Sequence, residues 1–141
     1  MKKIALILLT ALSISANAQT KQSNMKEQKN YTIMLLMNAT AKWLSLNRAE
    51  RSAFFEKEVI PIFSKVGENT KINLYDSEYF HSSVSDFMII NTTHLDEYEL
   101  IIELLRDTKI YGAPYFDIKD IIIGQENLFE SFNEKFKSFK Q

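Results

Sequence analysis

Tyr31–Asn38, with the sequence YTIMLLMN, is a short and nearly continuous apolar run. Val84–Thr92, with the sequence VSDFMIINT, has the same character. Short runs that are apolar at odd and even positions alike are typical of strands buried on both faces. The two stretches therefore predict the inner strands of a sheet, although the pattern alone leaves a helix over residues 31–38 open.

Two further strands are predicted, one before and one after Val84–Thr92 in the sequence. Thr70–Asp76, TKINLYD, alternates between apolar and polar residues and predicts a half-exposed strand. Tyr115–Ile123, YFDIKDIII, predicts a fourth strand after the breaker at residues 112–114. The sequence thus provides two inner and two outer strands.

Helices are predicted between the first and second strands and between the third and fourth. Asn47–Glu50 has the residues of a capping box, and an amphipathic pattern continues from it to about Lys65. Pro61 lies inside this helix and is expected to kink it or to start a new turn. The second helix is expected to have Thr93 as its N-cap and to end at Arg106.

The order of elements is β-α-β-β-α-β, followed by a Phe-rich helix from Gln125 onward. This order is that of the ferredoxin-like split β-α-β motif. It predicts an α+β domain with a four-stranded antiparallel sheet, two helices on one face and an extra C-terminal helix.

The inner strands also indicate how the sheet is covered. Along residues 31–38, Ile33, Leu35 and Met37 point to one face, while Met34 and Leu36 point to the other. An exposed apolar face is an association site by default, so something must cover the second one. Either the C-terminal helix folds back over it or a second subunit packs there; we favour a homodimer in which the tail helix braces the partner.

The N-terminus resembles a secretory signal peptide. Lys2 and Lys3 precede the apolar run Ile4–Leu9, and Ala16–Ala18 forms a small-x-small cleavage site. Cleavage after Ala18 predicts a periplasmic or secreted protein; a retained anchor helix is the alternative. Polar residues 19–30 are then a flexible leader, and residues 31–141 form the domain.

Composition excludes several classes of function. The 141-residue chain has a net charge of −1, which becomes −3 if Lys2 and Lys3 are removed, so neither nucleic acid nor a membrane surface is expected as a partner after signal cleavage. It has no cysteine and only two histidines, which excludes a closed Cys/His zinc site within one chain. It has neither a glycine-rich phosphate loop nor a G-x-S-x-G elbow, and we expect no cofactor.

Five short motifs carry a resemblance to a known family. The sequence resembles the darcynin family at Trp43–Arg51, Asp76–Phe80, Ser85–Asp86, Ala113–Ile118 and Asp120–Asn127. The resemblance implies a small bacterial protein of the dimeric α+β barrel type and a domain of unknown function. Related barrels include cofactor-free monooxygenases, haem-handling proteins and plain ligand binders, so the resemblance supports the fold more than any chemistry.

The sequence departs from the family pattern at two positions. The resemblance implies a basic residue near Ser83 and a proline near Ile123, and neither is present. The first departure puts a charge-based ligand contact at that position in doubt.

His81 and Asp86 are the candidate catalytic residues. His81 lies between two predicted strands, where it would be a general base, a haem ligand, a pH-sensitive contact or simply a solvated loop residue. Asp86 lies in an apolar strand, where a charge is costly unless it is compensated. It would cap the end of the strand, pair with Arg48 or Arg51, or line a cleft as a buried acid.

Four aromatic residues near loops and strand ends are the candidate ligand-binding residues: Trp43, Tyr75, Tyr111 and Tyr115. Large rings with one polar atom suit a pocket for a flat or aromatic ligand. The alternative is that they pack around the rim of a small core.

Three functions follow from these observations. The first is binding of a small apolar or aromatic ligand in a cleft between sheet and helices. The second is a cofactor-free monooxygenase of the antibiotic-biosynthesis type, with His81 as its base. The third is a structural or protein-interaction module without a ligand.

Overall fold

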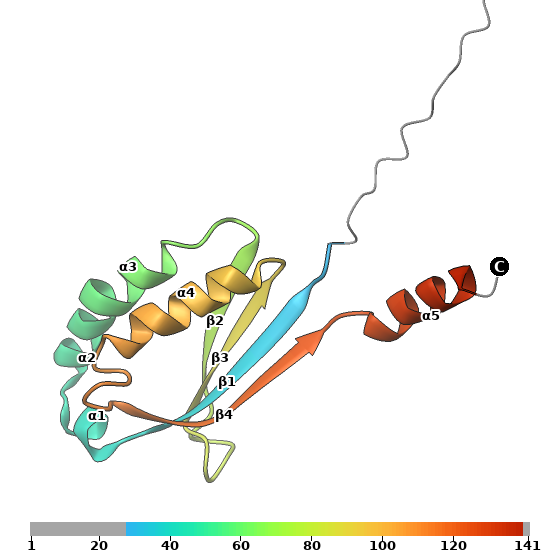
Figure 1. The fold of residues 1–141 in the computed structure, drawn as a ribbon. Coiled ribbons are helices and arrows are strands. Elements are labelled where there is room, and N and C mark those ends of the chain that lie inside the picture. Colours follow the sequence, from blue (N-terminus) through green and yellow to red (C-terminus); the bar gives the residue numbers. More distant parts are fainter. Residues whose placement is uncertain (1–27, 140–141) are drawn as a thin grey trace, which may run out of the picture.

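The computed structural model describes residues 28–139, so the expected signal peptide and most of the expected leader lie outside the described residues. Figure 1 shows the elements, and their bounds follow the chain. They are β1 (Tyr31–Ala39), α1 (Ala41–Ser45), α2 (Arg48–Phe54), the π-helical turn η1 (Phe55–Val59), α3 (Ile60–Phe63), β2 (Thr70–Asp76), β3 (Asp86–Thr92), α4 (Leu95–Arg106), β4 (Phe116–Gln125) and α5 (Leu128–Ser138).

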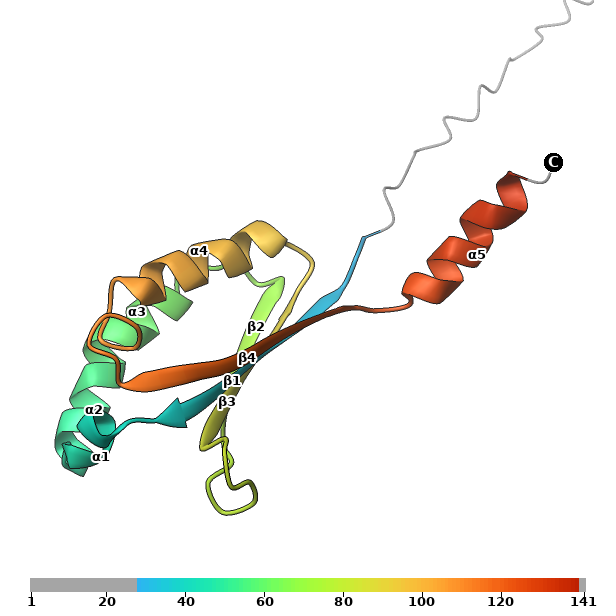
Figure 2. The ribbon, with the colours of Figure 1, turned by 60° about the horizontal axis from the view of Figure 1, so that its bottom comes forward.

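The strands form one antiparallel sheet in the order β2-β3-β1-β4. Helices α1 to α4 lie on one face of this sheet (Figures 1 and 2). The predicted α+β, ferredoxin-like arrangement is therefore confirmed, and the two apolar runs are its two central strands.

The core lies between the sheet and these helices. Leu35 of β1 is fully buried and pairs in register with Met88 of β3 on one side and with Ile121 of β4 on the other. The register of β1 against β4 shifts between Leu36 and Met37, which marks a bulge. The buried apolar residues are Ile33, Leu35, Met37, Trp43, Phe54, Val59, Ile62, Met88, Ile90, Ile101, Leu105, Ile110 and Phe116.

The predicted capping box is present at the start of α2. Asn47 Oδ1 accepts a hydrogen bond from the Glu50 amide at 3.0 Å, and the Asn47 amide donates to Glu50 Oε2 at 2.8 Å. The helix continues through η1, where the Ile60 amide donates to the Phe55 carbonyl, five residues back. Pro61 then lies in the first turn of α3. The helix thus widens into a π turn just before Pro61, which has no amide hydrogen to donate. A proline inside the helix was expected to disturb it at this point.

The expectation that Thr93 caps the second helix is wrong. Helix α4 begins at Leu95 with His94 at the cap position, and no side chain caps it. Strand β3 ends at Thr92, and the Thr92 hydroxyl accepts from the His94 amide at 2.9 Å. A threonine hydroxyl can bond the backbone amide two residues further along the chain. Here Thr92 makes this bond, one residue before the threonine that was expected to act as the cap.

Helix α5 extends beyond the end of the sheet, away from the other helices (Figures 1 and 2). The exposed fractions of Phe129 and Phe139 are 74% and 85%. The helix therefore does not cover the second face of its own sheet, and no other described helix lies there. Within residues 28–139, no helix is long and apolar enough to cross a bilayer.

Candidate functional site

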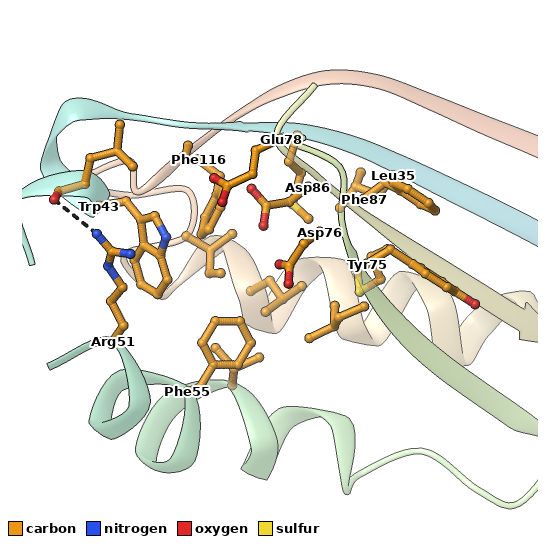
Figure 3. Close-up of a pocket in the computed structure, with 18 of the residues that line it drawn as sticks. Leu35, Trp43, Arg51, Phe55, Tyr75, Asp76, Glu78, Asp86, Phe87 and Phe116 are labelled. Atoms are coloured by element: carbon orange, nitrogen blue, oxygen red, sulfur yellow. Dashed lines mark hydrogen bonds between the residues drawn. The ribbon is translucent and has the colours of Figure 1, made fainter. Parts of the chain in front are cut away.

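A cavity of about 360 Å³ lies between the sheet and the α1–α3 region. Its lining includes residues at the end of the sheet where β2 ends and β3 begins (Figure 3). Its lining is mostly apolar and aromatic: Leu35, Met37, Ala39, Trp43, Leu44, Arg51, Phe55, Val59, Phe63, Leu74, Tyr75, Asp76, Glu78, Asp86, Phe87, Met88, Leu105, Ile110 and Phe116.

Trp43 forms the aromatic wall of this pocket. Its ring centroid lies 6.0 Å from that of Phe55 and 5.0 Å from that of Phe116. The short helix α1 holds it in place, because Thr40 caps that helix and the Thr40 amide donates to the Tyr115 carbonyl at 3.0 Å. The wall is therefore fixed to β1 and to the segment before β4.

Arg51 of α2 lies over the Trp43 ring, with 5.6 Å between its guanidinium carbon and the ring centroid. Its Nη2 donates to the Leu44 carbonyl at 3.1 Å (Figure 3). Its Nε is buried without a hydrogen-bond partner among the described residues. The guanidinium is thus engaged with α1 on one side and retains one unused donor.

Three carboxyl groups lie on the other side of Trp43, those of Asp76, Glu78 and Asp86 (Figure 3). Asp76 pairs with Asp86 across β2 and β3, so both side chains point to the helix-covered face of the sheet. Burial raises the pKa of Asp86, and the charges of Asp76 and Glu78 raise it further. The hydrogen bond from the Ser85 hydroxyl opposes the increase.

Ser85 positions this carboxyl group. Its hydroxyl donates to Asp86 Oδ2 and accepts from the Ala39 amide at 2.7 Å, and its own amide donates to the Met37 carbonyl at 3.0 Å. Asp86 is therefore anchored to the end of β1. Among the alternatives left open by the sequence, Asp86 lines a cleft, and no ion pair joins it to Arg48 or Arg51 in the described part of the chain.

The candidate ligand-binding residues are not all at the pocket. Trp43 and Tyr75 line it, but the Tyr75 ring stacks on Phe87 at a centroid distance of 4.7 Å. Tyr75 and Phe87 alternate with pocket-facing neighbours, so their rings point toward the opposite face of the sheet, although both residues also belong to the lining. Tyr115 lies behind Trp43, with 5.4 Å between their ring centroids. Tyr111 is also outside the lining, and burial raises the pKa of its hydroxyl.

His81 lies in the exposed loop between β2 and β3 and does not line the pocket. Its Nδ1 accepts hydrogen bonds from the amides of Ser83 at 3.2 Å and of Val84 at 3.1 Å. In this arrangement the ring closes a local turn.

Sequence reasoning missed Phe55, Asp76 and Glu78 as lining residues. The alternation of TKINLYD places Asp76 on the same face as Ile72 and Leu74, so its position was present in the pattern. Glu78 follows the end of the strand, where no periodicity predicts its direction. Within residues 28–139, no group of three or more Asp, Glu, His or Cys side chains is arranged to hold a metal ion.

Comparison with protein families gives a match over residues 18–135 to darcynin, described as a domain of unknown function. Darcynin 1 of Acinetobacter baumannii is 34% identical over 84 residues, which cover 60% of this chain and 92% of that protein. A darcynin homologue of Streptomyces avermitilis is 29% identical over 96 residues, which cover 68% of this chain and 78% of that protein.

Solved structures with the same fold are much less similar in sequence. Chlorite dismutase from Candidatus Nitrospira defluvii in complex with imidazole has a TM-score of 0.62 at 19% identity, covering 77% of this chain and 44% of that one. A heme-binding protein from Thermus thermophilus has a TM-score of 0.62 at 13% identity, covering 74% of this chain and 44% of that one. This chain thus spans less than half of either structure, and the likeness supports the fold alone.

Proposed function

The chain belongs to the darcynin family, and we propose that it binds a small apolar or aromatic ligand in the pocket between sheet and helices. The cavity of about 360 Å³ beside Trp43 carries this proposal. Ligand pockets are typically concave and mostly apolar, with a few polar groups that fix orientation, and have volumes of roughly 300–1,000 Å³. The pocket lies near the lower limit, which favours a ligand with one or two rings.

Haem is the ligand that the Thermus neighbour suggests, and the lining residues do not suit it. Haem iron is typically held by His, Cys or Tyr, or by Met together with His. The chain has no cysteine, and its histidines, His81 and His94, are exposed and outside the lining. The Tyr75 ring stacks on Phe87 instead of entering the pocket. The carboxylates of the lining would also repel the propionates of haem.

A thermal-shift screen tests the ligand proposal. Ala39 lines the pocket, so Ala39→Leu should fill part of it and reduce any stabilisation by aromatic compounds. Ala41→Leu is the matched control, because Ala41 is exposed at the start of α1 and outside the lining. Stabilisation of the wild type and of the Ala41 variant, but not of the Ala39 variant, is expected. If no aromatic compound stabilises the wild type, the structural or protein-interaction module becomes the better interpretation.

A homodimer through the open face of the sheet is the second part of the proposal. This face carries Met34, Leu36, Phe87 and Ile89, which are partly exposed, and Ile122, which is 52% exposed. A second copy would bury these residues, and the exposed Phe side chains of α5 would brace it.

Analytical ultracentrifugation tests the dimer. Ile89→Lys places a charge in the centre of the open face and should give a monomer under conditions where the wild type dimerises. Glu99→Lys on the exposed side of α4 is the control and should leave the dimer unchanged. A monomeric wild type at all concentrations would remove this part of the proposal.

A cofactor-free monooxygenase is the second candidate function. The observation in its favour is Asp86, a carboxyl group of raised pKa inside a pocket, as expected for a general base. His81, the base expected from the sequence, is outside the lining. Oxygen consumption with hydroquinone substrates should be lost in Asp86→Asn and retained in His81→Ala if Asp86 is the base.

Export is proposed from the sequence of residues 1–18 alone. Cell fractionation and N-terminal sequencing test it. A periplasmic or secreted protein that begins at Gln19 is expected, and a cytoplasmic protein that begins at Met1 would contradict it.

A further inference from the structure

The chemistry of the occupant follows from the charges around the pocket, provided that the pocket binds a ligand as proposed above. We propose that the pocket selects an organic cation, with a protonated amine beside Asp76, Glu78 and Asp86 and an apolar or aromatic body against Trp43. Three features support this: the acids have no ion-pair partner among the described residues and outnumber the one arginine of the lining, a metal ion does not suit them, and the remaining space is apolar.

None of the three carboxyl groups has an ion-pair partner among the described residues. Within residues 28–139, no Lys or Arg forms an ion pair with Asp76, Glu78 or Asp86. Arg51 also lines the pocket, but its guanidinium lies over the Trp43 ring and bonds the Leu44 carbonyl. The charged lining residues are thus three acids and one arginine, and this excess of acidic groups makes the pocket attract cations.

Two of these acids, Asp76 and Asp86, also repel each other, although Asp76 is exposed. Asp76 and Asp86 are directly opposite each other in the β2–β3 register, and like charges in that position are destabilising. Asp86 is only partly exposed, so water screens the repulsion incompletely. A protonated amine between the carboxylates would remove the repulsion and form charge-assisted hydrogen bonds.

A metal ion does not suit the same groups. The described residues contain no cluster of acidic or histidine side chains with the spacing of metal ligands. The rest of the lining is apolar and aromatic, including Phe55 and Phe116, and would remain unfilled around a bare ion. An amine attached to an apolar body satisfies both parts of the pocket.

Trp43 provides a direct probe of occupancy, because it is the only tryptophan in the chain. We would titrate its fluorescence at pH 7 with 2-phenylethylamine, 2-phenylethanol and 3-phenylpropionate, which are cationic, neutral and anionic. The amine should bind about tenfold tighter than the alcohol, as expected for a charge-assisted contact with a partly buried acid. The propionate should bind weakest.

Variants assign this preference to the acids. Asp86→Asn and Glu78→Gln should each reduce the advantage of the amine over the alcohol, and the double variant should bring it to about twofold or less. Glu130→Gln, on the exposed face of α5, is the matched control and should retain the full preference. Binding of 2-phenylethanol to each variant confirms that the pocket is still formed.

The outcomes separate this inference from the proposed function. Equal binding of all three probes, or tightest binding of the propionate, would overturn the cation preference and leave the ligand pocket standing. A preference that survives the double variant would also overturn it. If none of the probes changes the Trp43 signal saturably, the proposed pocket function fails, and this inference fails with it.

Discussion

The β2–β3 strand pair carries a pair of polar residues at each end, and the two pairs differ in their surroundings. At one end Thr70 pairs in register with Thr92, and at the other Asp76 pairs with Asp86. Both pairs point to the helix-covered face, six residues apart along β2. We refer to them as the threonine end and the carboxylate end.

At the threonine end the side chains of Thr70, Thr92 and Glu97 are joined by hydrogen bonds. The hydroxyls of Thr70 and Thr92 are hydrogen-bonded at 2.5 Å, and Thr70 also donates to the Glu97 carboxylate. Glu97 accepts from the Gly67 amide at 3.0 Å, which joins the start of β2 to α4. These hydrogen bonds lower the pKa of Glu97. This end of the sheet contributes stability.

At the carboxylate end the polar groups face a cavity and each other. Asp86 has one side-chain partner, Ser85, and its pKa is raised where that of Glu97 is lowered. The same pair of strands thus supports a hydrogen-bonded network at one end and a group of carboxyl groups beside a cavity at the other. Ionisable groups with a shifted pKa beside a cavity are typical of a functional site.

The largest effect is expected at the threonine end. Thr92→Val removes a buried hydroxyl that bonds both Thr70 and the His94 amide, and should lower the free energy of unfolding by about 2 kcal/mol. Urea denaturation measures it. Thr32→Val is the control, because the Thr32 hydroxyl bonds Asn91 at an exposed position, and should cost only a few tenths of a kcal/mol. If both variants lost the same free energy of unfolding, the threonine end would not be a special contributor to stability.

Glu97→Gln should lower stability at pH 7 by about 1 kcal/mol, since it weakens charge-assisted bonds to Thr70 and Gly67 that are partly exposed. The lowered pKa of Glu97 means that this contribution is present above the unfolded-state pKa of 4.5 and is lost as pH falls through the folded-state value. The difference between wild type and variant should therefore shrink in acid. A constant difference from pH 7 to pH 3 would contradict the assignment.

Asp86→Asn should have the opposite sign and raise stability at pH 7, by less than about 1 kcal/mol because the group is only half-buried. Its raised pKa means that its stabilising contribution is complete below 3.8 and is lost as pH rises through the folded-state value. The variant should thus gain over the wild type as pH rises from 3 to 7. A loss of stability at pH 7 would show that Asp86 supports the fold.

Asp76→Asn should give the smallest effect. Asp76 is exposed, so removing its charge should stabilise the protein by only a few tenths of a kcal/mol. Its effect should nearly vanish in the Asp86→Asn background, where the opposing charge is gone; a double-mutant cycle measures this coupling. Additive effects would mean that the two carboxylates do not interact.

The sequence predicted the fold better than the site, for a physical reason. Apolar runs and the Asn47–Glu50 box depend on local periodicity, and the structure has both where the pattern placed them. Trp43 and Asp86 were selected as a large ring and a charge in apolar surroundings, and both line the pocket. Glu78 was missed because it lies in an irregular loop, and its approach to Asp86 depends on how that loop folds back.

Local patterns also failed where the outcome depends on competing contacts. The Thr92 hydroxyl formed the turn that Thr93 was expected to make, because the strand ends one residue before it. The amphipathic pattern of α5 predicted a helix but not its direction away from the sheet. A single chain's pattern does not specify which surface its exposed apolar residues meet.

The carboxylate end borders a cavity, and we propose that this cavity admits a ligand. Met37 and Met88 line this cavity, whereas Met34 lies on the opposite face of the sheet. Methyl NMR of the protein carrying ¹³C-labelled methionine, titrated with 2-phenylethylamine, tests it most directly. The methyl signals of Met37 and Met88 should shift saturably while that of Met34 stays in place. Shifts of Met34 alone, or of none of the three, would contradict it.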